Sequence, residues 1–279
     1  PGTLDLPWLE RVRELGFDRI SLGVQTLEDG LLACLGRIHD AAGAMEALEW
    51  AARAGFSRRS ADLLVGVPGQ RPQRVLEDAR RLAATGLEHL SIYLLDLDKP
   101  CPLRARIQSG RLRAPSEDEV ADAFEALQEE LPRLGLWPYE ISNYARPGAE
   151  SRHNLRYWER RPYLGLGPGA ASQMANLRWT ESSSLRAWLD GGGLPEVQEM
   201  DAAQALAEIP LLGLRLHRGV DWAALRALAA SQGLAPLVEA WEEGLERFFS
   251  AGLLVREGDI LRLTPKGMLL SNAVFQTFV

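Results

Sequence analysis

The sequence predicts an α/β protein built on a parallel sheet, with a smaller domain at the C-terminal end. Apolar runs rich in Ile, Leu and Val occur at residues 18–25, 60–67 and 89–98. Amphipathic helical patterns fill the intervals, at 41–54 and 72–85. Strands and helices alternating in this way are typical of right-handed βαβ units. A length of 279 residues is sufficient for one large and one small domain.

Further helices are predicted on either side of these units. Apolar residues at helical spacing occupy positions 9 to 15, and Gly16 is a typical C-terminal stop. Ser116 with Glu119 three residues later forms a capping box, which starts a helix that runs to Gly135. A parallel sheet that begins on a helix, with no strand before it, indicates that earlier units precede this chain. We therefore expect a piece of a longer protein.

The pattern changes from about residue 195. Two short strands there flank "EGD", and a helix follows Pro265. Helices followed by a β-wing are typical of a winged-helix-like α+β module, so we predict one domain over 1–194 and a second over 195–279. The helices predicted before the wing are 201–217, 221–232 and 235–250.

Composition excludes several classes of protein. The formal net charge is −7, and residues 201–279 carry seven Lys plus Arg against nine Asp plus Glu, so nucleic acid is not an expected partner. No apolar stretch reaches the roughly 18 residues of a membrane span, and residues 1–15 resemble neither a signal nor a transit peptide. A cytoplasmic protein is expected.

The two cysteines, Cys34 and Cys101, lie far apart and outside any CxxC pattern. Neither a disulfide framework nor a zinc site is supported. Two thiolates also cannot hold an iron–sulfur cluster by the usual set of ligands.

A first group of polar residues lies at the carboxyl ends of the predicted strands, where parallel α/β sheets bind ligands. Gln25 ends the first strand, Asp62 lies in the second, and residues 93–96 end the third. Arg37 follows twelve residues after Gln25, close enough to fold over the same edge. The group suits a ligand with a carboxylate, an amine and ribose hydroxyls, with Arg37 on the carboxylate. Alternatively, Arg37 and Asp62 form a structural ion pair and Gln25 caps a loop.

A second group is the segment "HNLRYW", with a glycine-rich run at 165–172 after it. A histidine among aromatic residues can ligate haem iron or line the face of a flat macrocycle. Alternatively, the aromatic residues pack a domain seam. The four candidate residues are His153, Asn154, Tyr157 and Trp158.

Four other residues are weaker candidates. His39 could be a ligand but fits the start of a helix, and Cys101 before a proline could ligate haem but fits an ordinary loop cysteine. Glu140 and Asp96 could act as acids or bases, although single carboxylates near strand ends are common.

Six ordered motifs together resemble a known family. The chain is similar to the radical S-adenosylmethionine (SAM) family of oxygen-independent coproporphyrinogen III oxidases and their HemW-type relatives. This resemblance covers essentially the whole chain and implies the later part of a partial (β/α) barrel. The motifs are "GFDRISLGVQTLEDGLLACLGRIH", "ADLLVGVPGQ", "HLSIYLLDLD", "YEISNYARPG", "HNLRYW" and "YLGLGPGAAS".

The resemblance implies roles for five residues in binding SAM. Gln25, Arg37 and Asp62 match the positions that contact the cofactor in the family. Asp96 and Ala171 fall where the family has further contacts. The polar residues at the end of the first strand would therefore hold the methionyl and ribose parts of SAM.

One departure from the family pattern is large. Family members carry a CxxxCxxC motif that holds a [4Fe-4S] cluster, followed by a GGGTP-type strand and a Glu, and residues 1–279 contain none of these. The cluster cysteines are expected upstream of Pro1. The chain as printed is expected to be inactive in radical chemistry.

The HNxxYW motif separates the two branches of the family. It is a feature of the HemW type, which implies a haem chaperone that passes haem to respiratory proteins, with His153 and its neighbours as the haem contact. The alternative is an oxygen-independent coproporphyrinogen III oxidase, which makes protoporphyrinogen IX by oxidative decarboxylation. A third option is a binding module without a radical role.

Overall fold

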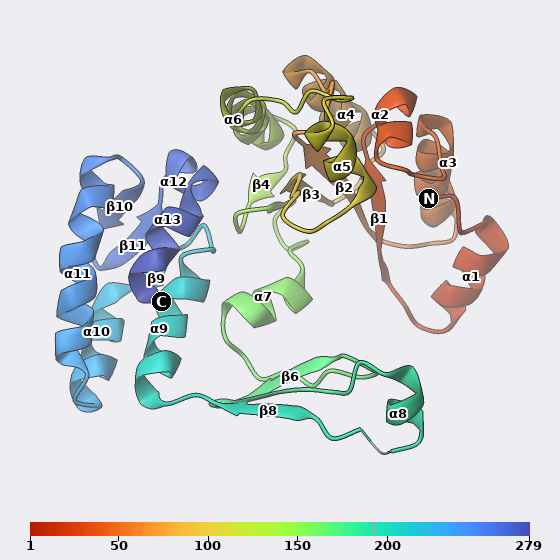
Figure 1. Cartoon of the computed structure of the whole chain (residues 1–279). Coiled ribbons are helices and arrows are strands. Elements are labelled where there is room, and N and C mark those ends of the chain that lie inside the picture. The colour runs from red at the N-terminus through yellow and green to blue at the C-terminus, as the bar shows by residue number, and fades with distance from the viewer. Residues whose placement is uncertain (192) are drawn as a thin grey trace. The chain divides into compact units, whose positions relative to one another are not determined.

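A computed structural model describes residues 1–191 and 193–279 of the chain, which divide into two compact units, Pro1–Glu150 and Ser151–Val279 (Figure 1). The boundary predicted between residues 194 and 195 differs from this division. Residues 151–191 belong with the C-terminal part because they include a helix that contacts α9 (Ala202–Gly213) and two strands of an antiparallel sheet completed by Glu196–Glu199.

The first unit is built on a sheet with the strand order β1-β2-β3-β5-β4. Strands β1 (Arg19–Gln25), β2 (Arg58–Val65) and β3 (His89–Leu94) are parallel, which confirms the predicted βαβ units. Strands β5 (Asn143–Ala145) and β4 (Trp137–Pro138) are antiparallel to their neighbours. The carboxyl ends of the three parallel strands therefore meet at one edge.

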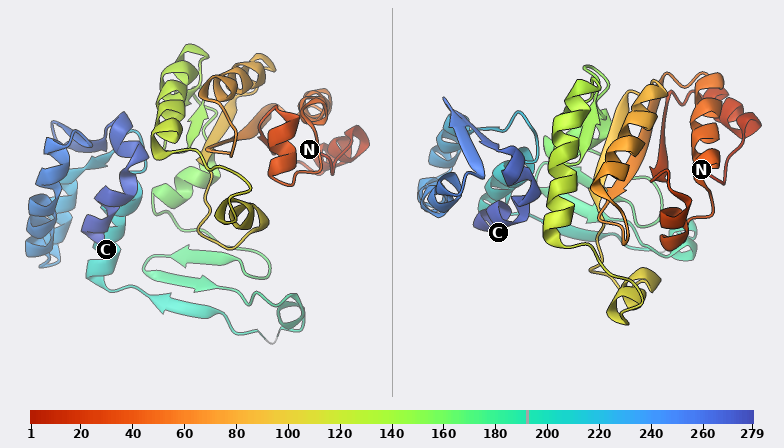
Figure 2. Two further views of the ribbon diagram at one scale, coloured as in Figure 1. Left: turned by 45° about the horizontal axis from the view of Figure 1, so that its top comes forward. Right: turned by 90° about the horizontal axis from the view of Figure 1, so that it is seen from above.

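Helices cover one face of this sheet, as the right-hand view of Figure 2 shows. Helices α3 (Ala41–Arg53), α4 (Pro72–Ala84) and α6 (Glu117–Arg133) pack against the strands. Alternate residues of the strands, such as Leu22 and Leu63, are buried beneath them. The remaining helices of the unit are α1 (Leu6–Glu14), α2 (Asp29–Cys34) and α5 (Pro102–Gln108).

Several boundaries of these helices follow directly from local signals. The predicted capping box is present, since the Ser116 hydroxyl accepts from the Glu119 amide and the Glu119 carboxylate accepts from the Ser116 amide. Asp40 caps α3 by accepting from the Gly43 amide at 2.7 Å. Gly55, just after α3, has φ 83°, a conformation that glycine adopts without a steric penalty.

The second unit begins with a part that the sequence analysis did not identify. Helix α7 (Arg152–Trp158) precedes an antiparallel sheet of β6 (Ala171–Met174), β7 (Leu177–Thr180) and β8 (Glu196–Glu199). A short helix, α8 (Leu185–Leu189), lies between β7 and β8. All four residues of β8 are exposed, so the strand lacks the alternation of apolar and polar residues that reveals strands in a sequence.

The rest of the second unit has the predicted helices and wing. Trp222, Trp241 and Phe278 form part of its buried core, with the Trp241 and Phe278 rings packed edge to face. No described helix is long and apolar enough to span a membrane. The elements are α9, β9 (Val220–Asp221), α10 (Trp222–Ser231), α11 (Ala235–Ser250), β10 (Leu254–Glu257), β11 (Ile260–Leu263), α12 (Pro265–Leu269), α13 (Ser271–Phe275) and a 3₁₀ turn, Gln276–Phe278.

Candidate functional site

A row of small and polar residues crosses the face of the first sheet opposite to α3, α4 and α6. The register places Asp62 of β2 opposite Ser91 of β3, and Ser91 opposite Asn143 of β5. On β1, Ser21 and Gly23 face the same side, since Ser21 bonds to Asp62 and a Cβ on Gly23 would lie 4.0 Å from an oxygen of Asp62. Strand alternation thus aligns groups from four strands into one polar surface.

Asp62 is the charged residue of this row. The Ser21 hydroxyl donates to Asp62 Oδ1 at 3.2 Å. Burial raises the pKa of Asp62 above its usual value, against the opposing effects of Ser91, Ser21 and Arg37. Burial therefore disfavours the charged form, and a ligand that brings a hydroxyl or an amine would stabilise it.

Gly23 keeps open the space in front of Gln25. A Cβ at position 23 would lie 2.8 Å from Gln25 Nε2, closer than real Cβ atoms approach another heavy atom. No hydrogen bond of the Gln25 amide is found within the described part of the chain. The residue is buried, with 6% of its surface exposed. Because buried polar groups are normally hydrogen-bonded, this amide suits a hydrogen bond to a bound group.

The backbone of Gln25 is in an uncommon conformation. Its φ is 70°, in the left-handed region that favours glycine, and the Thr26 amide donates to the Val24 carbonyl oxygen at 2.9 Å. This bond closes a three-residue γ-turn of the strained type around Gln25. Such a conformation costs roughly 1 to 3 kcal/mol and persists where the surroundings enforce it, often at functional sites.

Gln25→Gly is expected to raise the free energy of unfolding by about 1 kcal/mol, because glycine adopts a positive φ without strain. The same change removes the amide and should weaken ligand binding. Denaturant unfolding and calorimetry on one preparation would measure both effects. Gly23→Ala is the matched comparison, since its Cβ enters the binding space without relieving strain. A Gln25→Gly protein that is less stable than the wild type would contradict the account of the turn.

Arg37 lies beyond α2 and lines a pocket of about 620 Å³ together with Asp96. Leu64, Leu95 and Leu103 contribute an apolar lining. Among the described residues, no ion pair within 4.0 Å joins Arg37 to Asp62, so the alternative of a structural pair finds no support. Cys34 and Cys101 also line this pocket, and Cys101 accepts from the Arg104 amide as the N-cap of α5.

Asn143 is a site residue that the sequence analysis did not identify. It is buried, and its amide NH₂ donates to the carboxylate of Glu140, which fixes the orientation of the amide because a carboxylate only accepts. Its Oδ1 is buried without a hydrogen-bond partner. An unpaired buried oxygen of this kind suits a donor on a ligand, such as a hydroxyl. The alternation of polar residues in "HLSIY" was a signal for Ser91, whereas "ISNYA" shows no such alternation around Asn143.

These groups fit S-adenosylmethionine. Arg37 suits the carboxylate, the row from Asp62 to Asn143 suits hydroxyls and the amine, and the leucines of the pocket suit the adenine ring. The structure thus brings Gln25, Asp62, Arg37 and Asp96 to one edge of the sheet. Ala171 is the first residue of β6 in the second unit, and its predicted contact stays a prediction.

His89 lies further back on the same strand face, at the amino end of β3. Its Nδ1 is 2.7 Å from the Ser60 hydroxyl and its Nε2 is 2.8 Å from the Tyr139 hydroxyl. Burial, with Arg19 nearby, lowers the pKa of His89 to about 3. The imidazole is therefore neutral near pH 7 and acts as a structural support of the site.

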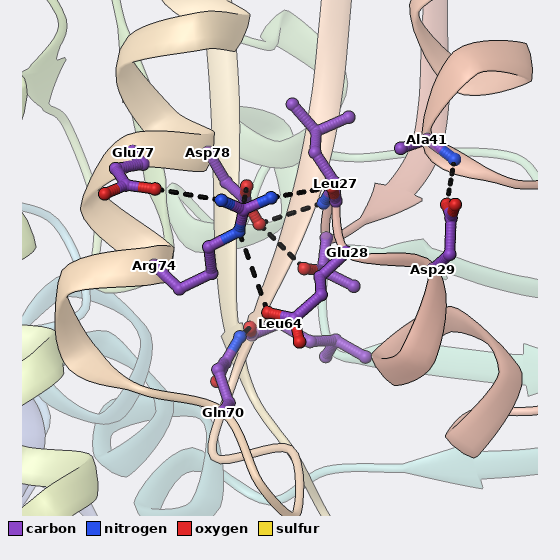
Figure 3. Close-up of polar contacts among 10 residues, drawn as sticks. Leu27, Glu28, Asp29, Ala41, Leu64, Gln70, Arg74, Glu77 and Asp78 are labelled. Carbon is purple, nitrogen blue, oxygen red and sulfur yellow. Dashed lines mark hydrogen bonds and ion pairs between the residues drawn. The ribbon is translucent and has the colours of Figure 1, made fainter.

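Two loops beside the pocket are held by side-chain hydrogen bonds. The Gln70 side chain accepts from the Gly66 amide at 2.9 Å and donates to the Leu64 carbonyl at 2.8 Å, which holds the loop after β2. Asp78 of α4 holds the turn after β1, as Figure 3 shows. His39, by contrast, precedes α3 with Nε2 3.4 Å from the Val24 carbonyl oxygen, and burial lowers its pKa.

In the second unit, the HNxxYW segment forms two pairs of residues at i, i+4 on α7. His153 and Tyr157 share one face, where His153 Nε2 lies 2.9 Å from the Tyr157 hydroxyl. The Tyr157 ring also packs edge to face on Tyr163, with ring centroids 4.5 Å apart. This face carries an exposed imidazole and a phenol, both of which are haem-iron ligands in proteins.

Asn154 and Trp158 share a second face of α7. The Arg215 guanidinium lies 4.4 Å above the Trp158 ring, and Trp158 lines a separate pocket of about 460 Å³ with residues of α9 and α10. Of the four residues predicted for haem, the structure brings His153 and Tyr157 together and turns Trp158 toward the helices that follow.

Metal-binding clusters of three or more His, Cys, Asp or Glu side chains are not found among residues 1–191 and 193–279. The chain contains two cysteines, so no residue here is assigned to an iron–sulfur cluster.

Two family models match the chain, one at each end. Residues 1–82 match the radical SAM superfamily, and residues 200–270 match the HemN C-terminal domain. Among solved structures, the coproporphyrinogen III oxidase HemN from Escherichia coli is similar over 99% of this chain and 67% of its own, with a TM-score of 0.81 and 19% identity. That similarity confirms the predicted fold.

Curated relatives are closer in sequence. "Heme chaperone HemW" of Mycobacterium tuberculosis is 33% identical over 96% of this chain and 67% of its own length. The Bacillus subtilis protein of the same name is 32% identical over 100% of this chain and 74% of its own. A mouse relative, "Radical S-adenosyl methionine domain-containing protein 1, mitochondrial", is 30% identical over 100% of this chain and 66% of its own. The chain therefore belongs to the HemW family of radical S-adenosylmethionine proteins.

Proposed function

We propose that the chain is part of a haem chaperone that binds haem on α7 and S-adenosylmethionine at the carboxyl edge of its first sheet. The observation that carries the haem proposal is the pair of His153 and Tyr157, 2.9 Å apart on one helix face. Both side chains can ligate haem iron, and two of the curated relatives named above, those of Mycobacterium tuberculosis and Bacillus subtilis, are named haem chaperones.

The exposure of this pair suits a protein that hands its cargo on. His153 is exposed and Tyr157 is half-buried. An enzyme that retains its haem encloses it, whereas a carrier must present the iron to a second protein. Transfer to an acceptor, such as a respiratory protein, and a cytoplasmic location belong to this proposal.

For SAM, the geometry of the first unit supports a role for each of four residues. Arg37 would bind the carboxylate, Asp62 and Asn143 would accept hydrogen bonds from hydroxyl or amine groups, and Gln25 would orient the ligand beside Gly23. In radical SAM proteins the cofactor supplies radical chemistry when it is bound. The residues of this chain bind and orient it.

Haem binding is tested by titrating the chain with haemin and following the Soret band. His153→Ala and Tyr157→Phe are each expected to weaken binding by about 10- to 100-fold, because one is the iron ligand and the other supports it. The variant that also changes the position of the Soret band identifies the ligand. Arg152→Ala, an exposed change on the same helix, is the matched control and should bind as the wild type does.

The alternative, oxygen-independent coproporphyrinogen III oxidase, predicts a different outcome. Conversion of coproporphyrinogen III by the protein, with haemin uptake unaffected by either substitution on α7, would overturn the chaperone proposal.

A further inference from the structure

The strained turn at Gln25 is held in place by α4, from the side opposite the proposed ligand. Asp78 Oδ2 accepts two hydrogen bonds, from the Thr26 hydroxyl at 2.7 Å and from the Leu27 amide at 2.9 Å. Thr26 is 0% exposed and Asp78 is 1% exposed. Both bonds act on the two residues that directly follow Gln25.

Arg74, one turn earlier in α4, holds the other side of the same turn (Figure 3). Its guanidinium donates to the Leu27 carbonyl oxygen at 3.2 Å, and its Nε lies 3.7 Å from both Glu28 Oε2 and Asp78 Oδ1. The amide and the carbonyl of Leu27 are thus both bound to α4. The backbone after Gln25 has little freedom to relax.

Burying the Asp78 carboxylate costs more free energy than filling the same space with apolar side chains would. Asp78 Oδ1 is buried without a hydrogen bond, and the nearest cationic atom, Arg74 Nε, also lacks one. Apolar residues at positions 26 and 78 would fill the same space without burying a carboxylate. Fixing the backbone at residues 26 and 27 is what the carboxylate adds.

We propose that Thr26 and Asp78 are positioning residues that set the Gln25 side chain for S-adenosylmethionine. Thr26 donates its amide to Val24 to close the γ-turn and its hydroxyl to Asp78, so it couples the strained residue to the helix. The inference rests on the cofactor site proposed above. Neither residue needs to touch the cofactor.

Thr26→Val tests the inference because valine keeps the shape and removes the hydroxyl. Calorimetric titration of the chain with SAM is expected to show affinity weakened by roughly 5- to 50-fold. Thr26→Ser, which restores the hydroxyl, should recover most of the affinity. Leu82→Val, a buried truncation in the same helix, controls for stability and should lower the unfolding midpoint while leaving SAM affinity unchanged.

A double-mutant cycle shows whether the effect passes through Gln25. In a Gln25→Ala background, Thr26→Val should cost little further affinity, since the side chain that it positions is gone. An equal loss in both backgrounds would overturn the inference, and so would a Thr26→Val protein that binds SAM like the wild type. A full-length wild-type protein with its cluster that binds no SAM would overturn the cofactor site itself, and the role of Thr26 with it.

Discussion

Acidification below pH 6.5 is expected to lower the free energy of unfolding through His89, by about 1.4 kcal/mol per pH unit. The pKa of His89 is about 3 in the folded protein, and the ordinary value in an unfolded chain is 6.5. Between these values the unfolded state binds the proton and the folded state does not. Stability from this group is therefore complete above pH 6.5 and is lost as the pH falls toward 3.

The measurement compares denaturant unfolding of the wild type and His89→Gln at several pH values. Glutamine can keep a hydrogen bond to Ser60 or Tyr139 but does not titrate, so the difference between the two proteins isolates His89. This subtraction is needed because burial also lowers the pKa of His39 and His217. Parallel stability curves for the two proteins between pH 6.5 and 4 would contradict the assignment.

Arg37→Ala is expected to weaken the binding of S-adenosylmethionine by roughly 1 to 3 kcal/mol, the cost of losing a charge-assisted hydrogen bond to a carboxylate. Arg37 is exposed at the pocket, and its guanidinium makes no ion pair within the described residues, so the substitution removes ligand contact with little effect on folding. Isothermal titration of the chain with SAM measures the loss.

Three further variants sharpen the Arg37 result. Arg37→Lys keeps the charge without the planar fork and should recover only part of the affinity. Arg53→Ala, exposed at the end of α3, is the matched control and should not change it. Arg106 lines the same pocket. A larger loss of SAM affinity in Arg106→Ala than in Arg37→Ala would indicate that Arg106, and not Arg37, binds the carboxylate.

The parallel units were predictable because their strands are buried runs of Ile, Leu and Val between helices with clear caps. The predicted strand at 18–25 corresponds to β1, and the helix predicted at 72–85 corresponds to α4. Strand β8 was not predictable in this way, since its side chains alternate between two exposed faces and carry no hydrophobic period.

At the site, Gln25, Arg37 and Asp62 were found from the sequence, whereas Ser91 and Asn143 were not. Gln25 and Arg37 interrupt an apolar pattern, which makes them visible. Ser91 and Asn143 share a surface only because of the register between β3 and β5, a pairing distant in sequence. The turn at Gln25 was equally hidden, because its φ depends on Asp78, fifty-two residues from Thr26.

The different ways in which these two loops are held have a consequence for how the first unit opens. Gln70 binds the loop after β2, and Asp78 with Arg74 binds the turn after β1. Displacement of α4 from the sheet would release the turn at residues 26–27, whereas the loop after β2 would keep its bonds because Gln70 lies within that loop. Residues 26–27 and α4 therefore form one cooperative unfolding unit, a foldon whose opening frees the turn at Gln25 while the strands stay paired.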